Sequence, residues 1–259
     1  MSEFEFIPTE KQIQESNIYK FMKKHDLSSL DELSLKSKND LEWFWKSVDE
    51  DIGIVWDSPY EKILDVSKGI AWSKWFVNGK TNIYNSSVEK FVKKDPDKIS
   101  YYFESEDGET SEITYSELDS KVSKFANGLK SLGVRKGDVI AIYLPMIEEA
   151  ILSILAAAKI GAIQTIIFSG YSSDSLHVRL KDCNAKILIV SDGFHRKGKI
   201  VSQKQSIEIA LKDTVVEKTI IIPYKGVDEY VTSENIVFYE KLVSSQDVIC
   251  KTEILDSED

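Results

Sequence analysis

The sequence predicts an α/β fold in which helices flank a mostly parallel sheet, with a helical and coil extension in front of it. Between residues 137 and 199, segments with strand character alternate with segments with helix character. This alternation is typical of a parallel sheet. The strand segments are continuous apolar runs, as expected for strands that are buried on both faces. In addition, all five tryptophans lie between Trp43 and Trp75, in the N-terminal part of the chain.

The N-terminal extension, residues 1–80, is predicted to contain two helices. They cover residues 12–25 and 39–48, and a polar stretch rich in Ser, Asp and Leu joins them. The tryptophans favour a segment that anchors itself over the main domain through large aromatic side chains. A stacking platform for nucleic-acid bases is the alternative. Such platforms combine aromatic residues with a positively charged groove, and no cluster of Lys and Arg surrounds these tryptophans.

The second predicted domain, residues 81–259, begins with a helix and a β-hairpin. The helix covers residues 82–94, and the hairpin pairs residues 99–105 with residues 110–115. Residues 115–133 are predicted to form a long helix. Its apolar residues recur at helical spacing and define a buried face. That face consists of Leu118, Val122, Phe125, Leu129 and Leu132.

The core of this domain is predicted within the alternating region. Strands are expected over residues 139–144, where Pro145 ends the strand, and over 162–170 and 185–192, with helices over residues 147–161 and 172–184 between them. The first of these two helices has a predicted apolar face made of Ile147, Ala150, Ile151, Ile154, Leu155 and Ala158. The remaining expectations are a basic loop over residues 193–199, a short helix over 206–211, a strand over 216–224 and a border between strand and helix within 234–245.

The charge balance and the cysteines exclude several classes of function. The net charge is −10, whereas surfaces that bind nucleic acid or membranes normally carry a basic excess. Neither partner is therefore expected. Cys183 and Cys250 lie far apart without CxxC spacing, which argues against a disulfide framework or a zinc site and favours a cytoplasmic protein. No apolar run reaches the roughly 18–20 residues that a membrane-spanning helix needs.

Two loops at the carboxyl ends of predicted strands are candidate ligand sites, because open parallel sheets bind ligands there. The first, residues 193–199, fits the GxxxxGK part of a phosphate-binding loop. Ile200 stands where a Ser or Thr hydroxyl would reach magnesium, so a degenerate P-loop-like nucleotide binder is only an alternative.

The loop over residues 193–199 also concentrates positive charge. It is either a solvated basic loop or a phosphate clamp, since Arg offers a bidentate fork and Lys a point charge. The polar residues concerned are His195, Arg196, Lys197 and Lys199.

The second loop is Phe168-Ser169-Gly170-Tyr171. Gly170 permits a tight turn or a close approach of the backbone to a ligand, and Phe168 or Tyr171 can lie against a purine. As a motif this is weak, because aromatic residues next to strand ends usually belong to the core.

Neither catalytic residues nor metal ligands are predicted. His25 and His177 have no acidic or cysteine partners at ligand spacing, so packing or surface roles are expected for them. No Ser-His-Asp arrangement and no pair of carboxylates stands out from the acidic surface.

Several segments together resemble a known family, the AMP-forming acetyl-CoA synthetases of the adenylate-forming acyl-CoA ligase superfamily. The resemblance is to the N-terminal part of these enzymes and runs through almost the whole chain. The segments are WFVNGKTN (residues 75–82), ITYSEL (113–118), FANGLKSLGVRKGDVIAIYLPMIEEAILSILAAAKIGAI (125–163), FSGYS (168–172) and SDGFHRKGK (191–199).

This resemblance implies a fold and a reaction. Residues 1–80 would be the N-terminal extension of acetyl-CoA synthetases, and residues 81–259 an incomplete first α/β subdomain of the AMP-binding domain, part of the large N-terminal domain of an adenylate-forming enzyme. Such ligases join a short carboxylic acid to ATP with release of pyrophosphate. They then transfer the acyl group from acyl-AMP to coenzyme A, which leaves acyl-CoA and AMP.

The resemblance also assigns a coenzyme A site. By position, five residues correspond to those that hold the nucleotide end of coenzyme A, with the two cations near its phosphates. Ser169 replaces a small residue that is usually glycine or alanine, and Lys199 stands where arginine also occurs. The five residues are Phe168, Ser169, Gly170, Arg196 and Lys199.

Several motifs of the family are absent from this sequence. It has no Ser/Thr/Gly-rich phosphate loop, no aromatic-Thr-Glu adenine motif, no ribose-binding Asp and no lysine of the mobile C-terminal domain. The site for ATP and magnesium is therefore expected to be missing, and the chain is expected to be inactive alone. A second chain that carries the rest of the ligase is a possible partner. The alternative is a noncatalytic subunit that completes or regulates a separate ligase chain.

Overall fold

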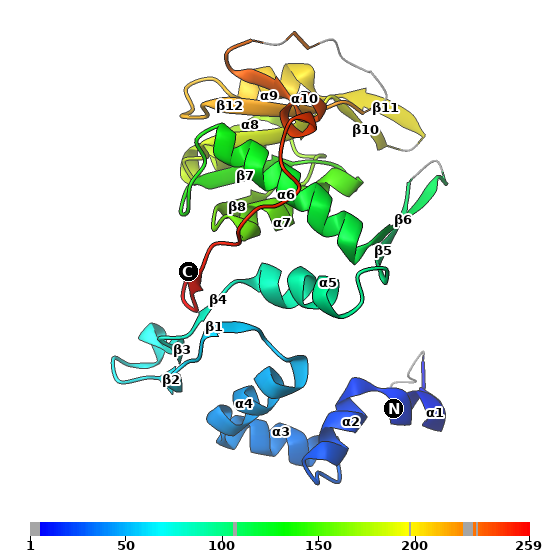
Figure 1. Cartoon of the computed structure of the whole chain (residues 1–259), viewed down its shortest axis with the longest axis vertical. Coiled ribbons are helices and arrows are strands. Elements are labelled where there is room, and N and C mark those ends of the chain that lie inside the picture. Colours follow the sequence, from blue (N-terminus) through cyan, green and yellow to red (C-terminus); the bar gives the residue numbers. More distant parts are fainter. Residues whose placement is uncertain (1–5, 106–107, 197, 225–229, 232) are drawn as a thin grey trace. The chain divides into compact units, whose positions relative to one another are not determined.

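A computed structural model gives the structure of the protein (Figure 1) and describes residues 6–105, 108–196, 198–224, 230–231 and 233–259; of Arg196 it describes the backbone alone. The chain divides into two compact units. One consists of Met1–Lys80 and Asp256–Asp259, and we call it the N-terminal unit. The other, Thr81–Leu255, we call the sheet unit.

The N-terminal unit starts with four helices in its described part. Helices are present where the two were predicted, but the polar stretch between them was wrongly predicted as a linker, because it is itself helical. Each helix begins where a polar side chain accepts a hydrogen bond from the backbone of the first turn. Ser29 Oγ, for example, accepts from the Glu32 N–H at 3.1 Å. The helices are α1 (Glu10–Glu15), α2 (Asn17–Lys24), α3 (Leu30–Asn39) and α4 (Leu41–Ile52).

Aromatic side chains pack against one another within this unit. The rings of Trp45 and Trp75 lie 5.6 Å apart, and Trp56 contacts Tyr60 at 5.0 Å. The indole N–H of Trp56 donates to Asp49 Oδ1 at 3.1 Å, so its polar edge is satisfied as well. The other elements of this unit are β1 (Trp56–Ser58), β2 (Lys62–Asp65), the 3₁₀ turn η1 (Ile70–Trp72) and β3 (Lys74–Val77). Two further strands, β4 (Lys80–Thr81) and β14 (Leu255–Asp256), have one residue in each unit.

The sheet unit is built on a five-stranded sheet with the order β13-β12-β9-β7-β8, and every neighbouring pair of strands is parallel. This confirms the predicted α/β fold. The strands are β7 (Val139–Tyr143), β8 (Ile163–Ile166), β9 (Ile187–Ser191), β12 (Lys218–Ile222) and β13 (Ile236–Phe238). Because strand residues alternate between faces, Ile140 and Ile142 belong to one apolar core, and Ala141 and Tyr143 belong to another.

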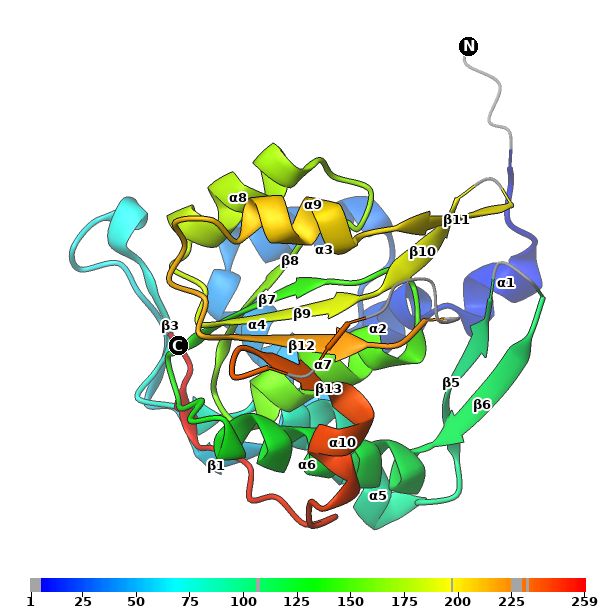
Figure 2. The same ribbon diagram turned by 90° about the horizontal axis from the view of Figure 1, so that it is seen from above.

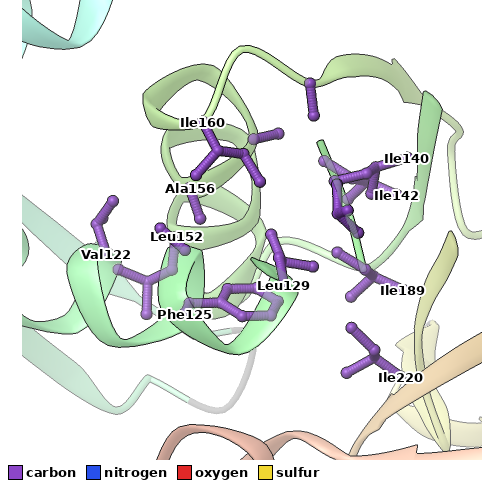
Figure 3. Close-up of a cluster of buried hydrophobic side chains, with 14 of the residues drawn as sticks. Val122, Phe125, Leu129, Ile140, Ile142, Leu152, Ala156, Ile160, Ile189 and Ile220 are labelled. Atoms are coloured by element: carbon purple, nitrogen blue, oxygen red, sulfur yellow. The ribbon is translucent and has the colours of Figure 1, made fainter. Parts of the chain in front are cut away.

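Helices cover both faces of this sheet (Figure 2). One core includes residues of α6, α7 and α10, and the other includes residues of α8 and α9. Figure 3 shows Val122, Phe125 and Leu129 of α6 beside Leu152 and Ala156 of α7 and Ile160 at its C-terminal cap, with isoleucines of three strands facing them. The helices are α6 (Tyr115–Ser131), α7 (Glu148–Lys159), α8 (Ser173–Asp182), α9 (Lys204–Ala210) and α10 (Tyr239–Ser244).

The two predicted helix faces had different outcomes. On α6, Leu118, Val122, Phe125 and Leu129 are buried as predicted. Of the second predicted face, Ile147 is buried, whereas Ala150, Ile154 and Leu155 are only partly buried. The fully buried apolar residues of α7 are instead Leu152, Ala156 and Ala157. The α7 sequence is apolar around most of its circumference, so its spacing did not define which face points inward.

The remaining elements connect these layers. The expected hairpin is present as β5 (Ile99–Glu104) and β6 (Thr110–Thr114), and it leads directly into α6 through a capping box at Thr114. The expected helix before it is a π-helical turn η2 (Asn85–Glu89) followed by α5 (Lys90–Lys94). The expected basic loop is a second hairpin, made of β10 (Gly193–Arg196) and β11 (Lys199–Ser202). The prediction of a loop there was therefore wrong.

Candidate functional site

A pocket of about 330 Å³ lies at the carboxyl ends of the parallel strands. Its wall combines the segments that follow β7, β8 and β12 with the β10 strand and the end of β5. The lining residues are Glu104, Ser105, Leu144, Pro145, Met146, Ile147, Phe168, Ser169, Gly170, Phe194, His195 and Tyr224. Most of these side chains are apolar or aromatic, as in sites for organic ligands.

Phe168, Ser169 and Gly170 line this pocket together. The Phe168 side chain is 67% exposed, and its ring lies edge-to-face on that of Tyr171 at 6.0 Å. A Cβ on Gly170 would approach Phe168 Cε1 to 2.7 Å, so a larger residue there would displace the ring. The absence of a side chain at Gly170 thus lets the Phe168 ring lie over the backbone at the mouth of the pocket.

A buried polar network supports the loop that contains these three residues. Tyr143 Oη lies 2.9 Å from the carbonyl oxygens of both Ser169 and Tyr171, which share its single hydroxyl proton. Gln203 Nε2 donates to the Ser169 carbonyl at 3.2 Å. Burial raises the pKa of Tyr143 above its ordinary value, although a hydrogen bond from Gln203 acts in the opposite direction. Tyr143 is therefore protonated at neutral pH and available as a donor.

The same network reaches the strand end that precedes the β10–β11 hairpin. Ser191 Oγ lies 2.8 Å from Gln203 Oε1 and 2.7 Å from the Gly193 carbonyl. Gln203 thus connects the loop after β8 to the start of β10. Nearby, the Tyr224 N–H donates to Asp192 Oδ1 at 2.6 Å, which joins the end of β12 to the end of β9.

The β10–β11 hairpin carries the predicted cations. Arg196 pairs with Lys199 across the antiparallel strands, and His195 lies further inward, with its ring 5.6 Å from that of Tyr224. Lys199 is exposed and is not among the residues of the pocket wall. The side chain of Arg196 and the whole of Lys197 lie outside the described residues. The structure thus gathers Phe168, Ser169 and Gly170 in the pocket and places the backbones of the two predicted phosphate-binding residues together at the far end of the hairpin.

The hairpin contradicts the P-loop alternative. A phosphate-binding loop runs from a strand through a glycine-rich loop into a helix. Here Gly193–Arg196 and Lys199–Ser202 are paired antiparallel strands. The GxxxxGK match therefore does not correspond to a P-loop.

The two histidines with expected structural roles have them. His25 packs against Phe21 and Trp43, and His177 Nδ1 lies 2.9 Å from the Ala210 carbonyl. Within the described ranges, no group of three His, Cys, Asp or Glu side chains is arranged to hold a metal ion. The same ranges contain no helix with the length and apolar character of a membrane span.

Sequence reasoning missed several residues of the site. Met146 follows a correctly predicted strand. Because ligands bind beyond the carboxyl ends of parallel strands, the sequence could have indicated Met146 as a site residue. Glu104 and Tyr224 come from distant segments, and no local pattern connects them to Phe168. Gln203 gives no signal of its own, because its role depends on contacts with Ser169 and Ser191 that only the folded chain creates.

Two family models match successive parts of the chain. Residues 88–253 match the AMP-binding enzyme family, and residues 30–86 match the acetyl-coenzyme A synthetase N-terminus. Together the two matches cover most of both units.

Individual relatives agree with these matches. The chain is 39% identical to the acetyl-coenzyme A synthetase of Methanothrix thermoacetophila over 250 residues, which are 95% of this chain and 38% of the relative. It is 37% identical to the acetyl-coenzyme A synthetase of Helicobacter pylori strain HPAG1 over 229 residues, which are 86% of this chain and 34% of the relative. The chain thus spans less than two fifths of the length of these relatives.

A solved structure has the same fold. The acetoacetyl-CoA synthetase from Streptomyces lividans superimposes with a TM-score of 0.85, at 24% sequence identity, over 96% of this chain and 39% of that one. At this identity, the likeness establishes the fold and not the substrate.

Proposed function

Because the chain belongs to the AMP-binding enzyme family and carries the N-terminal sequence of acetyl-coenzyme A synthetases, we propose that it forms the N-terminal part of an acyl-CoA ligase. The proposed reaction joins a short carboxylic acid to ATP and then transfers the acyl group to coenzyme A. The observation that carries the proposal is the pocket beyond the strands, in which Phe168, Ser169 and Gly170 meet the base of the β10–β11 hairpin. Acetate or a close relative is the proposed acid.

Within that reaction, we assign to this chain part of the coenzyme A site. Phe168 offers an exposed aromatic ring beside the pocket, and aromatic rings pack well on purines. Arg196 and Lys199 come from a basic hairpin in a chain of net charge −10. A local cluster of cations in an acidic protein suits the phosphates of coenzyme A, since Arg and Lys form charge-assisted hydrogen bonds with phosphate oxygens.

We propose further that this chain alone makes no acyl-adenylate. Adenylation requires the triphosphate to be held by positioned backbone donors, cations and magnesium. The sequence contains no Ser/Thr/Gly-rich loop for that task, and its one similar segment forms the β10–β11 hairpin. ATP and magnesium would then bind to sequence that this chain does not contain, either in the same protein or in a second chain.

The free thiols of Cys183 and Cys250 support a cytoplasmic location, because disulfides belong to oxidising compartments.

The test is acetate-dependent exchange of labelled pyrophosphate into ATP. It is run with this chain alone, and again after co-expression with a chain that starts at the phosphate loop of a related synthetase. We expect exchange from the pair and none from the chain alone. Exchange by the chain alone would overturn the proposed inactivity, and no exchange from either preparation would favour a noncatalytic role.

A further inference from the structure

The peptide between Ser169 and Gly170 has a defined orientation at the wall of the pocket. Two side chains donate hydrogen bonds to its carbonyl oxygen, Tyr143 Oη at 2.9 Å and Gln203 Nε2 at 3.2 Å. Both donor residues are only 2% exposed, so they approach from the interior of the sheet unit. The Ser169 carbonyl therefore points inward, away from solvent.

This orientation determines where the next N–H points. In a planar trans peptide, the carbonyl and the N–H point in opposite directions. The Gly170 N–H must therefore point away from Tyr143 and Gln203. No residue that the structure describes accepts a hydrogen bond from it, although Ser169 and Gly170 both line the pocket. A backbone donor without a protein partner at a pocket wall is available to a ligand acceptor.

The Gln203 amide is itself held in one orientation. Its Oε1 atom lies 2.8 Å from Ser191 Oγ, and Ser191 is fully buried. The reverse orientation of the amide would place Oε1 against the Ser169 carbonyl oxygen, where two acceptors would repel each other. The Ser191 contact and the Ser169 contact therefore favour the same arrangement, as expected of a satisfied buried network.

We propose that Gln203 and Tyr143 are positioning residues, which hold the Ser169–Gly170 peptide so that the Gly170 N–H donates to an acceptor on the nucleotide end of coenzyme A. The choice of ligand rests on the proposed function. The orientation of the peptide does not, because it follows from contacts within this chain. Neither residue lines the pocket, so both act through the backbone between them and the pocket.

The first experiment measures the orientation by NMR. The pair Ser-Gly occurs once in the sequence, at residues 169–170. A chain with ¹³C-carbonyl serine and ¹⁵N glycine therefore gives a single carbonyl-coupled amide signal, that of Gly170. We expect this amide to exchange rapidly with water in the free chain and to shift when coenzyme A is added. Slow exchange in the free chain would overturn the inference.

The second experiment compares variants by calorimetric titration with coenzyme A. Gln203→Met keeps the side-chain length and removes the donor. Tyr143→Phe removes the other donor, together with its contact to the Tyr171 carbonyl. We expect either change to weaken binding by about 10-fold, as for the loss of one hydrogen bond, and to move the Gly170 signal. The matched control is Gln205→Met, since Gln205 is an exposed residue of α9, the helix that Gln203 precedes. It should leave binding and the signal unchanged.

The outcomes separate the two proposals. If the unmodified chain binds no coenzyme A, the assignment of the ligand fails, while the exchange rate of the Gly170 amide still decides the orientation. If the unmodified chain binds and both variants bind equally well, the positioning role is wrong. Weaker binding with an unchanged Gly170 signal would also contradict it, because the effect would not pass through the peptide.

Discussion

The ammonium group of Lys159 lies 3.1 Å from Oδ1 of Asp119, although the Lys159 side chain is only 2% exposed. Glu89 Oε1 lies 3.6 Å from the same ammonium group, and the Tyr84 ring centroid lies 4.0 Å from it. Tyr84 Oη donates to Asp119 at 2.7 Å. Burial and the Asp119 charge raise the pKa of Tyr84 well above its ordinary range, so the tyrosine remains a neutral donor. The cluster links the end of α7 to α6 and to the turn η2.

Removal of the buried charge should destabilise the fold. Lys159→Met keeps most of the side-chain volume but removes the buried ammonium group from the Asp119 and Glu89 carboxylates. We expect the free energy of unfolding to fall by about 3 kcal/mol, at the lower end for a broken buried pair because both carboxylates are partly exposed. Urea titration measures this value. The control is Lys93→Met, because Lys93 contacts the same Glu89 at 3.9 Å but is 78% exposed. Its loss should cost under about 1 kcal/mol. Equal effects of the two changes would contradict a special role for the buried charge.

The centre of the sheet should tolerate truncation poorly. Ile142 in β7 is 1% exposed and faces α6 and α7, so Ile142→Ala should cost about 2–5 kcal/mol through lost contacts and a residual cavity. Ile154 on α7 is only partly buried, and Ile154→Ala should cost less. Ile166, at 64% exposure on the edge strand β8, serves as the control. Guanidinium midpoints of the three variants should follow that order, and similar midpoints for Ile142→Ala and Ile166→Ala would exclude it.

Acid should weaken the contact between Lys186 and Asp138, which directly precede the strands β9 and β7. Lys186 Nζ donates to Asp138 Oδ2 at 2.8 Å. Burial acts to raise the pKa of Asp138, but hydrogen bonds from Lys186 and from the Arg135 N–H hold it below its ordinary value of 3.8. A carboxyl with a lowered native pKa contributes stability above its unfolded pKa and loses that contribution as pH falls through the native value. We therefore expect stability to fall below about pH 4.

The pH dependence is measured by urea unfolding at several pH values between 7 and 3. Asp138→Asn should remove part of the decline at low pH, because the titrating group is gone. A decline as steep in the variant as in the parent would assign the acid sensitivity to other carboxyls.

The cations of the hairpin should bind phosphate groups. Arg196→Ala is expected to weaken coenzyme A binding by about 10–100-fold, from roughly 1.5–3 kcal/mol for a charged hydrogen bond. Calorimetry measures this with the chain alone, and the apparent KM for coenzyme A measures it in the co-expressed pair. The affinity for ATP and for the acid should change little. Lys212→Ala, which removes an exposed cation outside the hairpin, is the control. An unchanged KM for coenzyme A in Arg196→Ala would refute the assignment.

The sequence by itself determined the layered α/β fold of the sheet unit. Residues 187–190, for example, are a continuous run of Ile, Leu and Val, as expected for a strand that is buried on both faces. The contrast between apolar and polar positions also determined the buried face of α6. Because parallel strands place their carboxyl ends at one edge of the sheet, the loop of Phe168 and the segment after Asp192 were expected to lie close together, and both line the same pocket. That a ligand binds there stays a prediction.

Tertiary structure decided what local patterns do not encode. The inward face of α7 depends on the neighbours of a helix that is apolar on most sides, and the β10–β11 hairpin depends on pairing between Gly193–Arg196 and Lys199–Ser202. The hydrogen bond from Gln203 to Ser169 joins residues 34 positions apart. A bond from a side chain to a distant carbonyl leaves no periodicity or spacing in the sequence, because its geometry exists only after the strands between the two residues have taken their places in the sheet.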